Sequence, residues 1–168
     1  MGNLTEPAPR RFVMKTKLFG IGDDFWIDDE NGDHVYKVDG KTHRMRDTWK
    51  LEDADGNEVA VIRERSLSVR DAIKIELNGN EATVRKAIIG FGERYNVDVD
   101  EGEDLKVKGD FIGHEYTIER DGDTVAEVSK RWFTVRESYG IEVRGGIDPA
   151  LVISVAVAVD SLNGVVED

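Results

Sequence analysis

Arginine side chains are the first residues of this chain whose type and spacing could perform chemistry. Arg63, Arg65 and Arg70 lie close together in the sequence, on either side of Ser66-Leu67-Ser68. A guanidinium group binds phosphate and carboxylate groups through paired hydrogen bonds, so these arginines form a candidate anion-binding site. The alternative is that they pair with neighbouring carboxylates on an exposed sheet face, where such ion pairs contribute little.

Acidic runs raise the question of a metal site. The segments 28–33 and 53–57 carry several carboxylate and amide oxygens beside a glycine. Neither segment has the D-x-[DN]-x-[DN]-G spacing of a calcium-binding EF-hand loop. Asp and Asn at such positions are typical of tight hairpin turns, where their side chains bond to the backbone. We therefore expect no metal site and no cofactor.

Catalytic motifs are also missing from the sequence. The three histidines, His34, His43 and His114, are far apart and have no metal-ligand spacing. The chain has no cysteine, which excludes thiolate chemistry and disulfides. It contains no nucleophile elbow, phosphate-binding P-loop or dinucleotide fingerprint. No catalytic residue is identified, and we expect a protein that is not an enzyme.

The charge balance limits the partners of this protein. The chain of 168 residues has 35 acidic and 23 basic residues and a net charge of -12. Such a charge repels nucleic acid, so no nucleic-acid partner is expected. It is typical of a protein from a high-salt cytoplasm, where ions screen the self-repulsion, although an ordinary acidic surface is an alternative. Neither a signal peptide nor a transmembrane segment is visible, and residues 1–10 and 164–168 are expected to be a disordered leader and a short tail.

Short alternating strands account for most of the sequence. Four segments each contain two runs of alternating apolar and polar residues around a glycine-containing turn, which predicts β-hairpins. They are 25–38, 49–62, 73–84 and 116–128. Further strands are expected from residue 11 and in 95–99, 104–112 and 133–144.

One segment near the end of the chain has helical boundaries and an almost entirely apolar sequence. Asp148 is a good N-cap, Pro149 suits the first helical position, and Asn163-Gly164 can end a helix. Ser154 is the only polar residue between Asp148 and Asp160. The segment is too short to span a membrane, which takes about 20 residues. It therefore predicts a helix enclosed by the rest of the protein.

These two predictions support each other. About a dozen antiparallel strands can close into a barrel, and closure removes exposed strand edges. The lumen of so large a barrel is too wide for inward side chains alone to fill, and the apolar helix could fill it. The sequence thus predicts one mainly β domain over residues 11–163. Trp26, Trp49 and Trp132 are expected to pack between the barrel and its helix.

Several motifs also resemble those of a known family. KLFGIGDDFWIDDENGDHVYKVDGK (17–41), GDFIGHEYTI (109–118), VAEVSKRWF (125–133) and DPALVISVAVAVDSL (148–162) resemble the LURP-one-related family of the tubby C-terminal-like superfamily. The resemblance implies a twelve-stranded closed β-barrel around a central hydrophobic helix, here 149–162. The superfamily includes phosphoinositide-binding tubby proteins and phospholipid scramblases, and plant family members are linked to defence.

Two functional hypotheses follow. The first is a non-enzymatic binding or scaffold module for phospholipid headgroups or a protein partner, located in the cytoplasm or peripherally at the membrane. Its candidate headgroup site is Arg63, Arg65 and Arg70. The alternative is a small-molecule-binding or enzymatic barrel with its site at the barrel mouth. A filled barrel with an external basic patch favours the first, and a cavity beside the helix with convergent polar groups favours the second.

Overall fold

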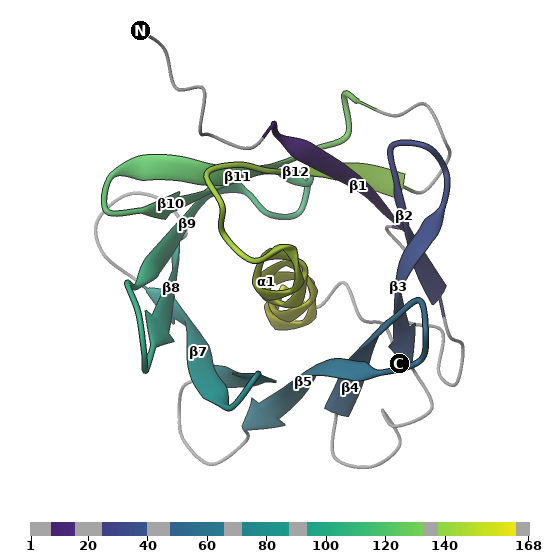
Figure 1. The fold of residues 1–168 in the computed structure, drawn as a ribbon. Coiled ribbons are helices and arrows are strands. Elements are labelled where there is room, and N and C mark those ends of the chain that lie inside the picture. Colours follow the sequence, from purple (N-terminus) through teal and green to yellow (C-terminus); the bar gives the residue numbers. More distant parts are fainter. Residues whose placement is uncertain are drawn as a thin grey trace, which may run out of the picture.

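The computed structural model describes residues 8–15, 25–39, 48–65, 72–87, 94–132 and 138–163. In this part of the chain, twelve antiparallel strands form one closed barrel, each pairing with its neighbours in sequence and β1 pairing with β12. The helix α1 (Pro149–Leu162) lies inside the ring of strands (Figure 1). The predicted twelve-stranded barrel around helix 149–162 is confirmed.

Most strand positions agree with the alternating pattern. The first strand begins at Arg10, one residue earlier than expected, and pairs there with Val143. The strands are β1 (Arg10–Lys15), β2 (Phe25–Asp29), β3 (His34–Asp39), β4 (Thr48–Asp53), β5 (Glu58–Arg65), β6 (Ala72–Leu77), β7 (Asn80–Ala87), β8 (Arg94–Val99), β9 (Leu105–Asp110), β10 (Glu115–Arg120), β11 (Asp123–Ser129) and β12 (Ser138–Val143). The expected leader and tail fall largely or wholly outside the described residues.

The acidic hairpin turns use their carboxylates to bind the backbone. Asp29 Oδ1 accepts hydrogen bonds from the backbone N–H groups of Asn31 (2.9 Å) and Asp33 (3.0 Å). Asp53 Oδ1 accepts two equivalent bonds in the β4–β5 turn. Gly32 follows Asn31 with φ 82°, a left-handed conformation that favours glycine. These carboxylates therefore have a clear role in turn geometry.

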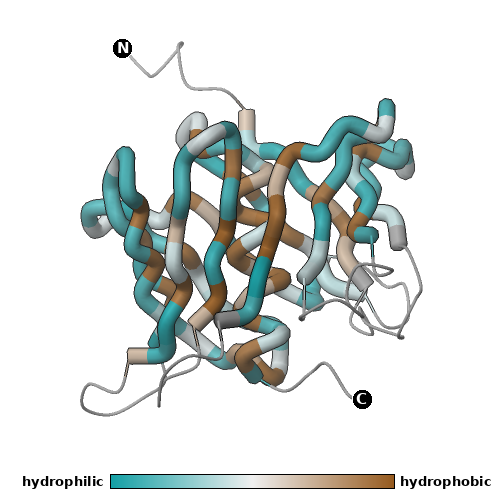
Figure 2. Tube along the Cα trace, turned by 90° about the horizontal axis from the view of Figure 1, so that it is seen from below, coloured by the Kyte–Doolittle hydropathy of each residue, from teal (hydrophilic) through white to brown (hydrophobic). Residues whose placement is uncertain are grey.

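The barrel has two different ends, as the side view in Figure 2 shows. The end that we call the hairpin end carries the β2–β3, β4–β5, β6–β7, β8–β9 and β10–β11 connections and the start of α1. The opposite end, the loop end, carries the other connections and the end of α1. Most of the loop-end connections lie outside the described residues. The connection between β9 and β10 is described completely.

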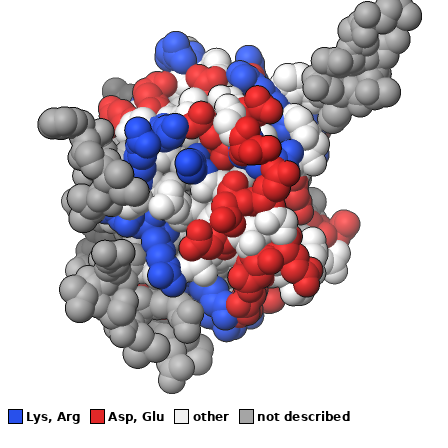
Figure 3. Space-filling view, turned by 90° about the vertical axis from the view of Figure 1, so that its left-hand side faces the viewer, with Lys and Arg blue, Asp and Glu red and all other residues white. Residues whose placement is uncertain are grey.

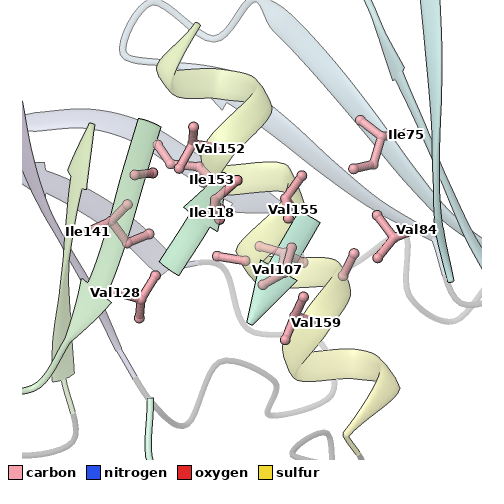
Figure 4. Close-up of a cluster of buried hydrophobic side chains, with 14 of the residues drawn as sticks. Ile75, Val84, Val107, Ile118, Val128, Ile141, Val152, Ile153, Val155 and Val159 are labelled. Carbon is pink, nitrogen blue, oxygen red and sulfur yellow. The ribbon is translucent and has the colours of Figure 1, made fainter. Parts of the chain in front are cut away.

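The helix is capped at its start and buried along most of its length. Asp148 Oδ1 accepts a hydrogen bond from the Ala150 N–H (2.9 Å), as predicted for an N-cap. From Val152 to Asp160 every side chain is buried. Figure 4 shows Val152, Ile153, Val155 and Val159 among apolar side chains of the barrel wall. Buried residues from all twelve strands join the helix in one hydrophobic core, so the helix fills the barrel.

The tryptophans do not all pack in this core. Trp49 is buried as expected, but Trp26 is 38% exposed. Its indole stacks on the imidazole of His34, with ring centroids 4.6 Å apart. Trp132 is half-buried, and the guanidinium carbon of Arg11 lies 5.0 Å from its ring centroid. The expectation was wrong for Trp26 because Phe25, Trp26 and Ile27 are all apolar, so the alternation does not show which of them points inward.

Candidate functional site

The arginine group predicted from the sequence is only partly within the described residues. Arg63 is exposed on β5, and its Nη1 lies 3.4 Å from Glu76 Oε1 on β6. Arg65 lies opposite Ala72 in the register, but its side chain is outside the described part, as is all of Arg70. Arg63 therefore makes the carboxylate pair that the alternative interpretation expects. The role of the group as a site stays a prediction.

A second group of cations lies on the outer surface of β7, β8 and β9, and we call it the basic face. It consists of Arg85, Arg94, Lys106 and Lys108. The register places Arg94 opposite Lys108, and Asn96 between Arg85 and Lys106. These side chains point away from the core because the residues that alternate with them are buried inside the barrel, namely Val84, Tyr95, Val97, Leu105 and Val107.

The sheet brings the basic face into line with part of the predicted group. Ala72 pairs with Arg65 on one side and with Arg85 on the other. The same row continues through Asn96 to Lys106. The backbone of Arg65 therefore lies in the same row as two cations of the basic face, although these residues are far apart in the sequence.

The cations of the basic face have few partners. Among the described residues, no carboxylate lies within ion-pair distance of Arg85, Arg94 or Lys106, whereas Lys108 Nζ lies 3.0 Å from Glu119 Oε2. Like charges directly opposite each other, as at Arg94 and Lys108, destabilise a sheet. A bound anion would relieve this repulsion, and a guanidinium can donate two parallel hydrogen bonds to one phosphate. The basic face can therefore hold a phosphate or carboxylate group.

Acidic residues limit the basic face on the side toward the hairpin end. A surface depression of ≈ 680 Å³ crosses the outer face of β8, β9 and β10, and Asn96, Lys106 and Lys108 line one part of it. The remaining polar lining includes acids, namely Asp98, Glu103, Asp104, Glu119 and Asp121. Figure 3 shows the same division across this side of the molecule, with Lys and Arg gathered toward the loop end and Asp and Glu toward the hairpin end. An anion is therefore best accommodated on the loop-end part of this surface.

A buried polar cluster, which no local pattern of the sequence predicts, joins the end of the helix to the barrel wall. The Tyr139 hydroxyl donates a hydrogen bond of 2.6 Å to Asp160 Oδ2. His114 Nε2 lies 3.3 Å from Asp160 Oδ1, and the His114 ring stacks on Tyr139 with centroids 4.3 Å apart. All three residues are buried, and Asp160 is fully enclosed. The cluster therefore fastens α1 to β12 and to the β9–β10 turn.

The environment of this cluster changes the acidity of two tyrosines. Burial raises the pKa of Tyr139 well above its usual value of 10.0, and the charge of Asp160 raises it further. The pKa of Tyr116 is also raised well above 10.0, first by burial and then by the charge of Asp160. Both hydroxyls therefore remain protonated at neutral pH. The cluster contains the residue types of an acid–base site, but its enclosure leaves no access for a substrate, and its geometry supports a structural role.

A larger depression lies at the hairpin end, where the alternative hypothesis places a small-molecule site. It has a volume of ≈ 1050 Å³ and includes the residues that precede α1. Several of its charged groups are already engaged, and its lining also includes the acidic residues Glu101, Asp121 and Asp123. Arg144 Nε lies 2.6 Å from Glu142 Oε1, Arg120 Nε lies 3.9 Å from Glu103 Oε2, and Asp148 caps the helix. The geometry gives this depression less support as a ligand site than the basic face.

A closed barrel of twelve antiparallel strands around one enclosed helix defines the architectural class of this protein. The family model of LURP-one-related proteins matches residues 10–160, and the chain belongs to this family. It is 25% identical over 149 residues to the uncharacterized protein YxjI of Bacillus subtilis, covering 88% of this chain and 90% of YxjI. It is 27% identical over 172 residues to Protein LURP-one-related 12 of Arabidopsis thaliana, covering 90% of this chain and 77% of that protein.

A solved structure shares the same fold. The X-ray structure of an Arabidopsis thaliana protein superposes with a TM-score of 0.70 at 20% sequence identity, covering 94% of this chain and 93% of that one. This likeness supports the fold alone. Within the described residues, α1 is too short to cross a bilayer, and no other helix that could do so is present.

Proposed function

We propose that this protein is a non-enzymatic binding module that holds the phosphate groups of anionic phospholipids at the basic face. The observation that supports this most directly is the set of three cations, Arg85, Arg94 and Lys106, without a carboxylate partner among the described residues of a protein with a net charge of -12. The filled barrel also favours an external site. The module would act in the cytoplasm, peripherally at the membrane.

The salt concentration determines which contacts at the basic face can bind a phosphate group. At low salt, the net negative charge of the protein repels an anionic bilayer over a long range. At about 1 M salt the screening length falls to about 3 Å, which removes this repulsion and also weakens the attraction of exposed cations. Only short, paired contacts between guanidinium and phosphate groups then remain effective. The proposal therefore requires lipid binding that persists in molar salt.

Co-sedimentation with vesicles tests the proposal. Vesicles of phosphatidylcholine alone are compared with vesicles that also contain phosphatidylglycerol or a phosphatidylinositol phosphate, in millimolar and molar KCl. We expect binding only to the anionic vesicles, and roughly hundredfold weaker binding for Arg85→Gln/Arg94→Gln, because each of the two lost charge-assisted contacts contributes about 1.5 kcal/mol or more. A second double variant, Arg63→Ala/Arg65→Ala, tests the arginines predicted from the sequence.

A matched control removes two cations elsewhere. Lys50→Gln/Arg120→Gln changes the net charge by the same amount, but Lys50 pairs with Glu58 (3.5 Å) and Arg120 pairs with Glu103 (3.9 Å). This variant should bind as the wild type does in molar KCl. The proposal is wrong if the wild type binds no anionic vesicle at any salt concentration, or if the control Lys50→Gln/Arg120→Gln loses as much affinity as Arg85→Gln/Arg94→Gln.

A further inference from the structure

The turn between β9 and β10 displays an apolar side chain in the open. Ile112 is 72% exposed, and Trp26 is the only other large hydrophobic side chain exposed within the described residues. Whereas Trp26 is covered on one face by His34, Ile112 projects from the loop end of the barrel between Phe111 and Gly113. A single exposed apolar residue is common on protein surfaces. Ile112 is distinguished by the turn that carries it and by the charges around it.

The residues on both sides of Ile112 are anchored inside the protein. The Phe111 ring packs against Tyr95 and Tyr116, at centroid distances of 4.7 Å and 5.4 Å. His114 stacks on Tyr139 and adopts φ 54°, an uncommon conformation for a residue other than glycine. With Phe111 and His114 held in this way, the exposure of Ile112 is imposed by the fold.

The backbone of the turn is equally constrained. Gly109 has φ 138° opposite Tyr116, where an added Cβ would lie 2.6 Å from the carbonyl oxygen of Glu115. Asp110 Oδ1 accepts a hydrogen bond of 2.9 Å from the Gly113 N–H. The β9–β10 turn is therefore a rigid support that presents one aliphatic side chain.

Cations lie on both sides of this turn. Lys108 precedes it on β9, opposite Arg94, and Lys130 and Arg131 follow β11, the other neighbour of β10. The nearby acids are engaged in local contacts: Asp110 bonds to the turn itself, and Glu115 Oε1 accepts hydrogen bonds from Ser129 and the Lys130 N–H. Glu115 Oε2 also lies 3.8 Å from Arg131 Nε. Lys108 and Arg131 have acidic partners of their own, Glu119 (3.0 Å) and Glu127 (3.3 Å), whereas Arg94 and Lys130 have no ion pair among the described residues. An exposed aliphatic side chain beside these two cations matches an anionic membrane surface, which attracts the cations and accepts the aliphatic group at its interface.

We propose that the β9–β10 turn docks this protein on anionic membranes by inserting Ile112 into the bilayer interface, with the loop end of the barrel facing the membrane. This inference rests on the proposed lipid-binding function and adds the orientation and a second contact to it. The acidic hairpin end faces away from the bilayer, because the division of charge in Figure 3 makes the opposite orientation repulsive.

The absence of cysteine from the chain makes a direct test possible. A single cysteine is introduced by Ile112→Cys and labelled with an environment-sensitive NBD fluorophore. The control is Ala54→Cys in the exposed β4–β5 turn at the hairpin end, labelled in the same way. On adding phosphatidylglycerol vesicles in molar KCl, we expect a blue shift and an increase of emission from position 112, and no change from position 54.

Co-sedimentation of unlabelled variants separates this inference from the proposed function. Ile112→Ser should bind about tenfold more weakly, the factor expected from partial burial of one aliphatic side chain, while Ile112→Leu should bind as the wild type does. Binding that depends on Arg85 and Arg94 but not on position 112, without a spectral change at 112, would overturn the docking inference alone. Wild-type protein that binds no anionic vesicle would overturn both. Equal spectral changes at 54 and 112 would contradict the orientation.

Discussion

Replacing Tyr139 by phenylalanine tests whether the buried cluster fastens the helix to the barrel. The Tyr139 hydroxyl is the only group among the described residues that donates a hydrogen bond to Asp160, and Asp160 is 0% exposed. Removing this donor leaves a buried carboxylate with His114 Nε2 3.3 Å from its other oxygen. We expect the free energy of unfolding to fall by about 3 kcal/mol, since the loss of one partner from a buried charged contact is expensive.

Substitution of the partner residue, Asp160, and the double variant complete a thermodynamic cycle. Asp160→Leu leaves the buried Tyr139 hydroxyl with only the Met14 sulfur, a weak acceptor at 3.8 Å, which should cost about 2 kcal/mol. If the two residues were independent, the double variant Tyr139→Phe/Asp160→Leu would lose about 5 kcal/mol. Because it replaces both partners by apolar groups of similar shape, we expect a loss of only about 2 kcal/mol and hence a coupling of about 3 kcal/mol.

Urea unfolding at constant molar KCl, followed by tryptophan fluorescence, measures these differences. The slope of the unfolding free energy against urea should be the same for all variants, so that changes in the midpoint report stability. Ser154→Ala is the control, because the Ser154 hydroxyl bonds within the helix to the Ala150 carbonyl (2.7 Å) and its loss should cost less than about 1 kcal/mol. Losses for Tyr139→Phe and Asp160→Leu that add within about 0.5 kcal/mol would refute the proposed coupling.

Three further predictions concern the helix, salt and alkaline pH. Val155→Asp places an unpaired charge at a fully buried position and should lower the free energy of unfolding by several kcal/mol or abolish folding. Ending the chain after Asp148 should be at least as damaging. A truncated protein that melts cooperatively and has native circular dichroism would contradict the role of the helix. Because the net charge is -12, the melting temperature should fall as KCl is lowered from molar to millimolar; a flat or rising melting temperature would count against adaptation to high salt. Burial and the charge of Asp160 raise the pKa of Tyr116 and Tyr139 in the folded protein. In the unfolded protein tyrosine ionises near pH 10, so the stability that these two residues contribute should be fully present below about pH 10 and be lost as the pH rises above it. Reversible ionisation of all four tyrosines near pH 10 in the folded protein, measured by absorbance at 295 nm, would contradict this.

Local signals in the sequence predict the elements of this fold well. Each hairpin has a turn whose residue types suit the backbone, as at Asp29 and Gly32, and the helix has its cap at Asp148. The alternation of apolar residues indicates which side of each strand faces the core, and closure follows because a barrel without edges buries the apolar helix. These features depend on residues that are close together in the chain, so they can be predicted from one sequence without knowledge of long-range contacts.

The candidate site depends instead on contacts between distant residues. Arg85 and Lys106 belong to different strands, and only the register of β7, β8 and β9 brings them into one row. Likewise, Asp160 lies at the end of an apolar run, and nothing local shows that it meets His114 and Tyr139. The one available signal was the aspartate itself, placed inside a helix that the sequence already predicts to be enclosed. Proximity in the sequence therefore indicates Arg63, Arg65 and Arg70 as a group of cations, but it does not reveal the basic face.

Locating a soluble headgroup on the protein tests the central claim most directly. The backbone amides of isotopically labelled protein can be followed by NMR during titration with glycerophosphate or an inositol phosphate in molar KCl. We expect saturable shifts in β7, β8 and β9 around Arg85, Arg94 and Lys106, and none in the β4–β5 turn. Shifts confined to the hairpin-end depression around Arg120 and Arg144, or no saturable shift at all, would contradict the basic face as the anion-binding site.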